Sequence, residues 1–108
     1  MIDRITSMRK RQRHLRAVWE EATLAEAEGT QRVDGRDYFP PDAVNWDLLQ
    51  PSEHVSVCPW KGVASYYDVV VDGHRLERAA WTYETPSHAA RHIGGHVAFW
   101  RGVQVVSD

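Results

Sequence analysis

Two long strand-like runs that meet at Asp72-Gly73 constrain the fold of this chain more than any other feature. Asp-Gly between such runs is a strong signal for a two-residue turn that joins antiparallel strands. Residues 62–71 precede the turn and are rich in Val and Tyr, which favour strands. Residues 74–83 follow it and end in a Trp-Thr-Tyr sequence. The pattern predicts a long hairpin at the centre of a β domain.

Counting outward from the turn predicts the register of this hairpin, since a two-residue loop fixes which residues face each other. Asp68 would then lie opposite Glu77, and like charges directly opposed destabilise a ladder. We expect Arg75 or Arg78 to relieve this repulsion from a diagonal position. The predicted pairs are Val71 with His74, Val69 with Leu76, Asp68 with Glu77, Tyr67 with Arg78, Ser65 with Ala80 and Ala64 with Trp81.

The remaining chain also reads as short strands separated by turn residues. Pro41 begins one expected short helix through Val44, and a second is expected over residues 86–93, with Thr85 as its N-cap. We therefore expect a mainly β, antiparallel domain with two or three short helices. Further strands are expected at residues 14–19, 22–26, 30–33 and 54–58, with a final hairpin that pairs residues 97–100 with residues 103–106.

Length and composition indicate one domain in a reducing compartment. The chain has 108 residues, enough for a single modest core, and 43% of them are hydrophobic. One cysteine excludes an internal disulfide framework. No apolar run is typical of a signal peptide, and none approaches the roughly 20 residues needed to cross a bilayer. We expect a cytoplasmic protein with no membrane partner.

The charge is distributed unevenly along the chain. Residues 1–16 carry six bases and one acid, a net charge of +5, and the rest carries seven bases and fourteen acids, a net charge of −7. We expect residues 1–13 to form a basic arm and residues 14–108 a single β domain. A basic arm can bind nucleic acid, but no aromatic residue precedes Trp19 to stack on bases. The pattern therefore favours a solvated terminus over a nucleic-acid partner.

Four motifs in order resemble one known family. They are Tyr38-Phe39-Pro40-Pro41-Asp42, Cys58-Pro59-Trp60-Lys61-Gly62, the stretch Glu77-Arg78-Ala79-Ala80-Trp81-Thr82-Tyr83 after Asp72-Gly73, and Ile93-Gly94-Gly95-His96-Val97-Ala98-Phe99-Trp100. The resemblance as a whole covers roughly residues 15 to 106 of the chain. The chain is similar to a bacterial family known only as domain of unknown function number 427, which is uncharacterised and sometimes labelled nucleotidyltransferase-like.

This resemblance implies a β-tent, in which two small sheets meet at an angle. Better-known β-tents often pin their sheets with a four-cysteine zinc site, which a chain with one cysteine cannot form. The nucleotidyltransferase label finds no support in the residues. Gly94-Gly95 is followed only by Asp108, where paired magnesium-binding carboxylates are needed, and no phosphate-cradling Gly-rich loop occurs. We expect no zinc site and no cofactor.

Aromatic residues concentrate in the central hairpin and the turn before it. By the predicted register Trp81, Tyr83, Tyr66 and Ala64 share one face of the hairpin, and Tyr67, Ser65 and Arg78 share the other. Aromatic walls with polar residues at their rim suit a compact polar ligand or a peptide. The alternative is that these rings pack in the core of a small protein. The candidate ligand-binding residues are Trp60, Lys61, Ser65, Tyr67, Glu77 and Trp81.

Two other functions fit parts of the sequence. A small enzyme could use Lys61 and Glu77 in acid–base chemistry, with Cys58 as a nucleophile that needs a nearby cation or helix N-terminus. His54 is some 13 Å from Cys58 along an extended strand, too far to act as its base. A second alternative is a nucleic-acid or protein interaction module that works through the basic arm. A pocket around Lys61, together with a shifted pKa of the Lys61 ammonium, would favour the enzyme.

Three histidines recur at a spacing of four residues near the C-terminus. His88, His92 and His96 would share one face of a continuous helix, which is typical of a metal site. Gly94-Gly95 should end the helix before the third histidine. No His-Glu-x-x-His motif occurs, so we expect no metal.

Overall fold

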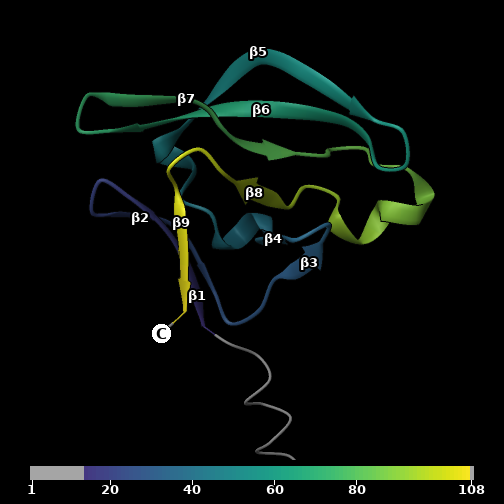
Figure 1. The fold of residues 1–108 in the computed structure, drawn as a ribbon, viewed down its shortest axis with the longest axis horizontal. Coiled ribbons are helices and arrows are strands. Elements are labelled where there is room, and N and C mark those ends of the chain that lie inside the picture. Colours follow the sequence, from purple (N-terminus) through teal and green to yellow (C-terminus); the bar gives the residue numbers. More distant parts are fainter. Residues whose placement is uncertain (1–13, 108) are drawn as a thin grey trace, which may run out of the picture.

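A computed structural model describes residues 14–107 of the chain (Figure 1). This part is mainly β, as predicted, with antiparallel strands and three short 3₁₀ segments. The basic arm predicted at residues 1–13 lies outside the described residues. The strands are β1 (Leu15–Trp19), β2 (Ala22–Ala27), β3 (Gln31–Val33), β4 (Arg36–Tyr38), β5 (Leu49–Cys58), β6 (Gly62–Val71), β7 (His74–Thr82), β8 (Val97–Phe99) and β9 (Gln104–Ser107).

Three antiparallel sheets build the domain. Their strand orders are β2-β1-β9, β3-β4 and β5-β6-β7-β8. Phe39, just after β4, exchanges two backbone hydrogen bonds with Val97 at the start of β8, at 2.8 and 2.9 Å. These bonds set the β3–β4 hairpin beside β8. In Figure 1, β5, β6 and β7 run along the top, β8, β4 and β3 follow below, and β1 and β9 run across the direction of the upper strands. The expected meeting of two small sheets at an angle is confirmed.

Two hydrophobic clusters use the two faces of the larger sheet. Neighbouring residues alternate between them, as the period of two in a strand requires. Tyr38 and Ala98 enter one cluster, while Phe39 and Val97 enter the other. The first cluster joins this sheet to β1 and β2 through Leu15, Ala17, Leu24, Ala25, Phe39, Val44, Leu49, Val69, Val71, Ala79, Ala80, Val97 and Phe99. The second cluster contains Tyr38, Ala64, Trp81, Tyr83, Ala90, Ile93 and Ala98.

The predicted central hairpin is present, but its register is correct only near the turn. Val71 pairs with His74 and Val69 with Leu76, as counted. Beyond these pairs β7 contains a bulge, so that Tyr67 pairs with Ala80, and the predicted pairing of Tyr67 with Arg78 is wrong. Ser65 likewise pairs with Thr82 and Tyr66 with Trp81. The predicted face of Trp81, Tyr83, Tyr66 and Ala64 is nevertheless correct, with Tyr67 on the other face, because the bulge adds two residues and preserves the alternation beyond it.

Asp68 holds the bulge, and it does not pair with Glu77. Its Oδ1 accepts a hydrogen bond of 2.9 Å from the backbone N–H of Arg78, which has a φ of 55°. Its Oδ2 accepts one of 2.7 Å from the Arg75 guanidinium, so Arg75 does contact Asp68, although the opposition of Asp68 and Glu77 that it was expected to relieve does not occur. Sequence counting missed the bulge because it depends on a side chain in the opposite strand.

The predicted final hairpin is wrong. A turn does form at Arg101-Gly102, where Val103 donates a backbone hydrogen bond of 3.2 Å to Trp100. The two strands then separate: β8 pairs with β7 and β9 pairs with β1. Leu15 of β1 lies opposite Ser107 of β9, so the two ends of the domain are neighbours.

The short helices occur where proline residues predicted them, as 3₁₀ turns. The segment η1 (Pro41–Ala43) has Pro at its start. The segment η2 (Trp46–Leu48) was expected only as irregular chain, and Asn45 caps it by accepting from the Asp47 N–H. The segment η3 (His88–Ile93) begins two residues later than expected. Strand β5 is also longer than predicted because it includes Pro51. None of the helical segments within residues 14–107 is long and apolar enough to cross a membrane.

The turn of the central hairpin offers a test of the fold. Gly73 has a φ of +81°, and a Cβ built there meets no atom within 4 Å, so only backbone strain opposes a larger residue. We expect Gly73→Val to lower the free energy of unfolding by roughly 1 kcal/mol or more, measured by urea denaturation. Gly29→Val is the matched control, since its Cβ would also meet nothing and its φ lies outside the left-handed region. Equal urea midpoints for the two variants would contradict this turn geometry.

Candidate functional site

The loop between β5 and β6 buries Lys61, which is only 7% exposed. A backbone hydrogen bond of 3.2 Å from the Lys61 N–H to the Cys58 carbonyl closes the loop. The segment before η3 is hydrogen-bonded to this loop through Ser87. The Ser87 N–H donates to the Lys61 carbonyl at 2.9 Å, and the Ser87 hydroxyl donates to the Trp60 carbonyl at 2.5 Å. Gly62 has a φ of +114°, a conformation that favours glycine, and this lets the chain leave the loop beside Pro86.

Lys61 forms an ion pair with Asp34, which lies in the turn between β3 and β4. The Lys61 Nζ is 2.5 Å from the Asp34 Oδ2. The ammonium also lies 5.3 Å from the centroid of the Trp60 ring and 5.7 Å from that of the Tyr83 ring. Two aromatic faces and one carboxylate therefore surround a cation that has lost most of its water.

Electrostatics keep both members of this pair charged. Burial works to lower the pKa of Lys61, but the hydrogen bond to Asp34 and the nearby Tyr38, Tyr83 and Cys58 outweigh it, so the pKa of the ammonium is raised. The Lys61 hydrogen bond lowers the pKa of the Asp34 carboxyl, against a smaller opposing effect of burial. Burial raises the pKa of Tyr83 to about 12, although the charge of Lys61 opposes this, so the phenol stays neutral.

These shifts bear on the enzymatic alternative. A lysine that acts as a base or nucleophile at neutral pH needs a lowered pKa, and Lys61 has a raised one. Glu77 is exposed next to the β7 bulge, and Cys58 packs half-buried against the second cluster. The charged Lys61 can still hold an anion or a carboxylate in place, which is its observed contact with Asp34.

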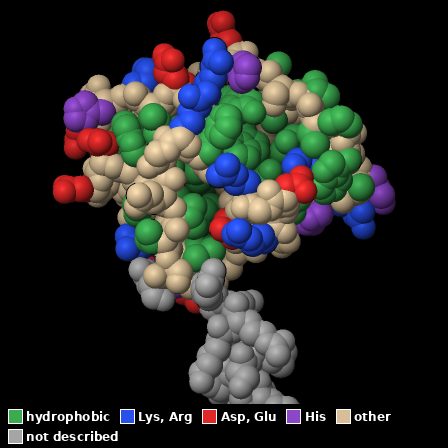
Figure 2. All heavy atoms as spheres, in the orientation of Figure 1, with side chains coloured by type: hydrophobic (Ala, Val, Ile, Leu, Met, Phe, Trp, Pro, Cys, Tyr) green, Lys and Arg blue, Asp and Glu red, His purple; other side chains and the backbone are tan. Residues whose placement is uncertain are grey.

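Four rings follow each other across the larger sheet, and we call them the aromatic row: His54, Tyr66, Trp81 and Trp100. The ring centroids of His54 and Tyr66 are 4.8 Å apart, those of Tyr66 and Trp81 are 6.2 Å apart, and those of Trp81 and Trp100 are 5.7 Å apart. The first, second and fourth rings are half-buried, and Trp81 is 9% exposed. Figure 2 shows hydrophobic side chains gathered at the centre of one face of the molecule, with Lys and Arg side chains around them.

The polar atoms of three rings in the row are tied to the protein. The Tyr66 hydroxyl is 3.0 Å from the Ser56 hydroxyl. The Trp81 indole N–H donates to the Tyr38 hydroxyl at 3.2 Å, and the Trp100 indole N–H donates to the Arg78 carbonyl at 2.5 Å. These bonds fix the orientation of the rings, so the row presents ring faces and edges rather than polar groups.

The structure brings together three of the six predicted site residues. Trp60 and Lys61 contact each other, and Lys61 reaches Trp81 through the rings of Tyr83 and Tyr38. Trp60 is exposed by 43%, so this end of the site is open to solvent.

The other three predicted residues lie elsewhere. Tyr67 packs on the first cluster, with its ring centroid 5.5 Å from that of Trp46. Ser65 shares the strand face of Tyr67, two residues away along β6. Glu77 is exposed at the bulge. Sequence analysis missed Asp34, Tyr38 and Trp100 as site residues, although the last two stood in the family motifs.

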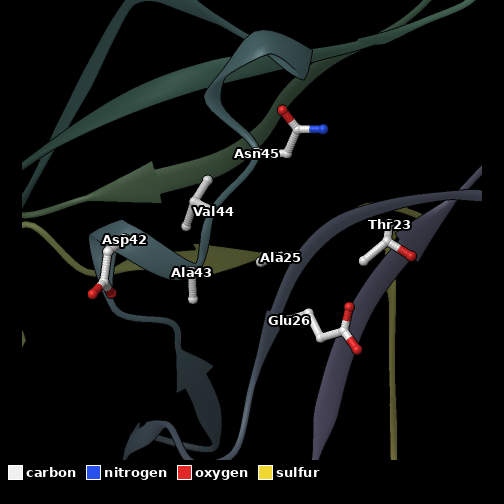
Figure 3. A pocket seen from close by; sticks show the side chains of 7 residues that line it. All are labelled: Thr23, Ala25, Glu26, Asp42, Ala43, Val44 and Asn45. Carbon is white, nitrogen blue, oxygen red and sulfur yellow. The ribbon is translucent and has the colours of Figure 1, made fainter.

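Three hollows of the described part have no ring of the aromatic row in their lining, although Arg36, which lies over the Trp81 ring, lines the third. The one in Figure 3 has a volume of about 360 Å³ and lies between β2 and the η1 segment. The second, of about 320 Å³, is next to Gly29 and His96, and the third, of about 270 Å³, is next to Arg32 and Val105. The first is lined by Thr23, Ala25, Glu26, Asp42, Ala43, Val44 and Asn45.

The three histidines do not share a helix face. His88 and His92 lie in the 3₁₀ segment η3, where three residues complete a turn, so a spacing of four does not align them. His88 bonds Arg91, and the His96 ring bonds the Gly94 carbonyl. Across residues 14–107 no three His, Cys, Asp or Glu side chains are grouped so that they could hold a metal ion.

The two members of the ion pair should differ in their contribution to stability. Asp34→Asn leaves a buried ammonium without a carboxylate, which is strongly unfavourable. Lys61→Met removes that charge, keeps an unbranched side chain between the two rings, and leaves an Asp34 carboxylate that is 53% exposed to water. We expect the larger loss of unfolding free energy for Asp34→Asn in urea denaturation at pH 7. A larger loss for Lys61→Met would contradict this account.

The same pair predicts a dependence on pH. Because the folded protein lowers the pKa of Asp34, its contribution is complete above the ordinary pKa of about 3.9 and is lost as the pH falls through the lowered value. The stability difference between wild type and Asp34→Asn should therefore be constant from pH 8 to pH 5 and shrink below about pH 4. A difference that is unchanged at acidic pH would show that the carboxylate does not matter.

Comparison with known proteins assigns the chain to one family. No curated protein matches the chain. Residues 7–108 match a family described as a domain of unknown function, DUF427. The match spans almost the whole chain and every strand described above. The protein therefore belongs to the DUF427 family, as the four sequence motifs suggested.

Proposed function

We propose that this domain binds a compact polar ligand or a short peptide on the aromatic row, by recognition rather than by catalysis. The observation that carries the proposal is that three rings of the row are held by hydrogen bonds within the protein while the row remains partly open to solvent. A ligand would lie across the rings at the protein surface.

The held rings supply contact area at a small entropic cost. Binding normally costs about 0.5–1.5 kcal/mol for each flexible side chain that it orders. The indole of Trp81 is already hydrogen-bonded to Tyr38, and that of Trp100 to the backbone, so little ordering remains. Large rigid aromatic rings are the side chains that recognition surfaces favour for this reason.

Core packing alone does not account for the row. Tyr38 and Ile93 of the same cluster are 1% and 0% exposed, as core residues are. His54, Tyr66 and Trp100 are left half-buried on one face. Partly exposed aromatic rings that lie side by side are typical of a surface that contacts another molecule.

The proposal keeps three of the residues predicted from sequence. Trp81 lies within the row, and Trp60 and Lys61 connect to it through the rings of Tyr83 and Tyr38. Ser65, Tyr67 and Glu77 are left out, since they lie on the opposite face or at the bulge. Lys61 would act through its position between the Trp60 and Tyr83 rings, with Asp34 as its permanent partner.

A pair of matched tryptophan variants tests this proposal. Trp100→Leu removes one ring of the row together with one hydrogen bond to a backbone carbonyl. Trp46→Leu removes a half-exposed indole that likewise donates to a backbone carbonyl, that of Pro41, but packs against Tyr67 on the other face. A library of compact aromatic acids, amides and amines and capped tripeptides is screened by thermal shift. Circular dichroism checks that both variants fold.

We expect ligands that stabilise the wild type and the Trp46 variant but lose most of their effect on the Trp100 variant. A ligand at 100 times its Kd stabilises a protein by about 2.7 kcal/mol, enough for a shift of several degrees in Tm. Ligands that stabilise all three proteins equally would contradict the proposed site, and so would a library without any ligand for the wild type.

A further inference from the structure

Several arginines of the domain have no acidic partner among the described residues, although acids outnumber bases there. Residues 17–108 hold seven bases and fourteen acids. Three of the seven bases form ion pairs with acids: Lys61 pairs with Asp34, Arg32 with Asp37 and Arg75 with Asp68. Arg91 bonds His88. The remaining three are Arg36, Arg78 and Arg101, and no acid among the described residues pairs with their side chains.

Two of these arginines contact the aromatic row. The Arg36 guanidinium lies 5.8 Å from the centroid of the Trp81 ring, and the Arg101 guanidinium lies 4.9 Å from that of the Trp100 ring. Arg78 meets the row through its backbone carbonyl, which accepts the Trp100 indole N–H. Two cations without acidic partners among the described residues thus adjoin two neighbouring rings, in a domain whose net charge is negative.

Arg36 is the best placed of the three to bind a ligand. Within the described residues its side chain donates one hydrogen bond, to the Phe99 carbonyl at 3.4 Å, close to the limit of such a bond, so most of its five donors are open. The two nearest acids along the chain are occupied: Asp34 by Lys61, and Asp37 by Arg32 and Thr30. Stacking on Trp81 holds the guanidinium without using its donors.

We infer that the ligand of the aromatic row carries a negative charge, a carboxylate or a phosphate, which Arg36 binds while a flat apolar part lies against Trp81 and Trp100. This inference rests on the proposed function, and it names the class of ligand. The guanidinium fork matches a carboxylate or phosphate with two parallel hydrogen bonds. Arg101 adds positive potential at the far end of the row.

The arrangement fits a compact ligand with one anionic group. Arg36 and Trp81 lie close enough for one small molecule to reach both, since the guanidinium already lies 5.8 Å from the ring centroid. Lys61 adds little net charge, because Asp34 neutralises it. The anionic site is therefore formed by Arg36 on the rim, and its exposure to water keeps it sensitive to salt.

Matched probes that differ only in charge test the inference. Naphthalene-2-carboxylate and 2-naphthyl phosphate carry the anion, naphthalene-2-carboxamide is the neutral counterpart, and inorganic phosphate carries the anion without a ring. Binding of each is measured by calorimetry on wild type, Arg36→Gln and Arg91→Gln. Arg91 is the matched control because it also bonds a backbone carbonyl, that of His88, and has no acidic partner among residues 14–107.

We expect each naphthyl anion to bind the wild type and the Arg91 variant at least about tenfold more tightly than the amide, as a charge-assisted hydrogen bond allows. Arg36→Gln should abolish that preference, and added salt should reduce it in the wild type. Equal binding of acid and amide, no binding of either acid, or a preference that survives in Arg36→Gln would each overturn the inference.

Further measurements separate this inference from the proposed function. If acid and amide bind the wild type equally and both lose affinity in Trp100→Leu, the aromatic site stands and only its charge preference fails. If no probe depends on Trp100, the proposed function fails. Inorganic phosphate that binds as tightly as the naphthyl anions would overturn the role of the rings. A single-stranded thymidine oligonucleotide that binds far more tightly than the compact probes would overturn the compact ligand in favour of nucleic acid.

Discussion

The ion pair between the buried Lys61 and the half-exposed Asp34 is the contact on which the shape of the ring-bearing sheet depends. The strands follow each other as β5, β6, β7 and β8, with β4 set beside β8 by the bonds between Phe39 and Val97. The loop after β5 and the turn after β3 therefore lie at opposite ends of this order. Their contact requires the strands to curl around the second hydrophobic cluster. Because burial opposes the charge of Lys61, the ionised Asp34 carboxylate stabilises this curl.

A second constraint is the bulge in β7, which connects the fold to the aromatic row. Asp68 binds the backbone of Arg78, and the Arg78 carbonyl in turn accepts the Trp100 indole N–H. The sequence predicted the hairpin at Asp72-Gly73 because its signals are local: a turn dipeptide between two strand-forming runs. It could not predict the bulge, since that depends on one carboxylate across the ladder. The prediction of a final hairpin failed for a similar reason, because β9 pairs with β1 from the other end of the chain.

Part of the candidate site was accessible from the sequence, and part was not. Trp81 and Lys61 stood out because aromatic and charged residues concentrate around one predicted hairpin. The contact between Lys61 and Asp34 spans 27 residues, and no local pattern links the two positions. Arg36 and Trp100 meet the row only because β4 and β8 lie side by side. Pairing between distant strands decides such contacts, and a single sequence does not show it.

The central claim is that the ion pair holds the β3–β4 hairpin against the aromatic row, and the indole N–H resonances report on it directly. Asp34 lies in the turn of that hairpin, and Tyr38 at its end accepts the Trp81 indole N–H. In ¹H–¹⁵N spectra at pH 7, Asp34→Asn should shift or broaden the Trp81 indole signal and speed its exchange with water. The Trp46 indole, bonded to Pro41 on the other face, should be unaffected. A Trp81 signal with unchanged position and exchange rate in a folded Asp34→Asn protein would contradict the account.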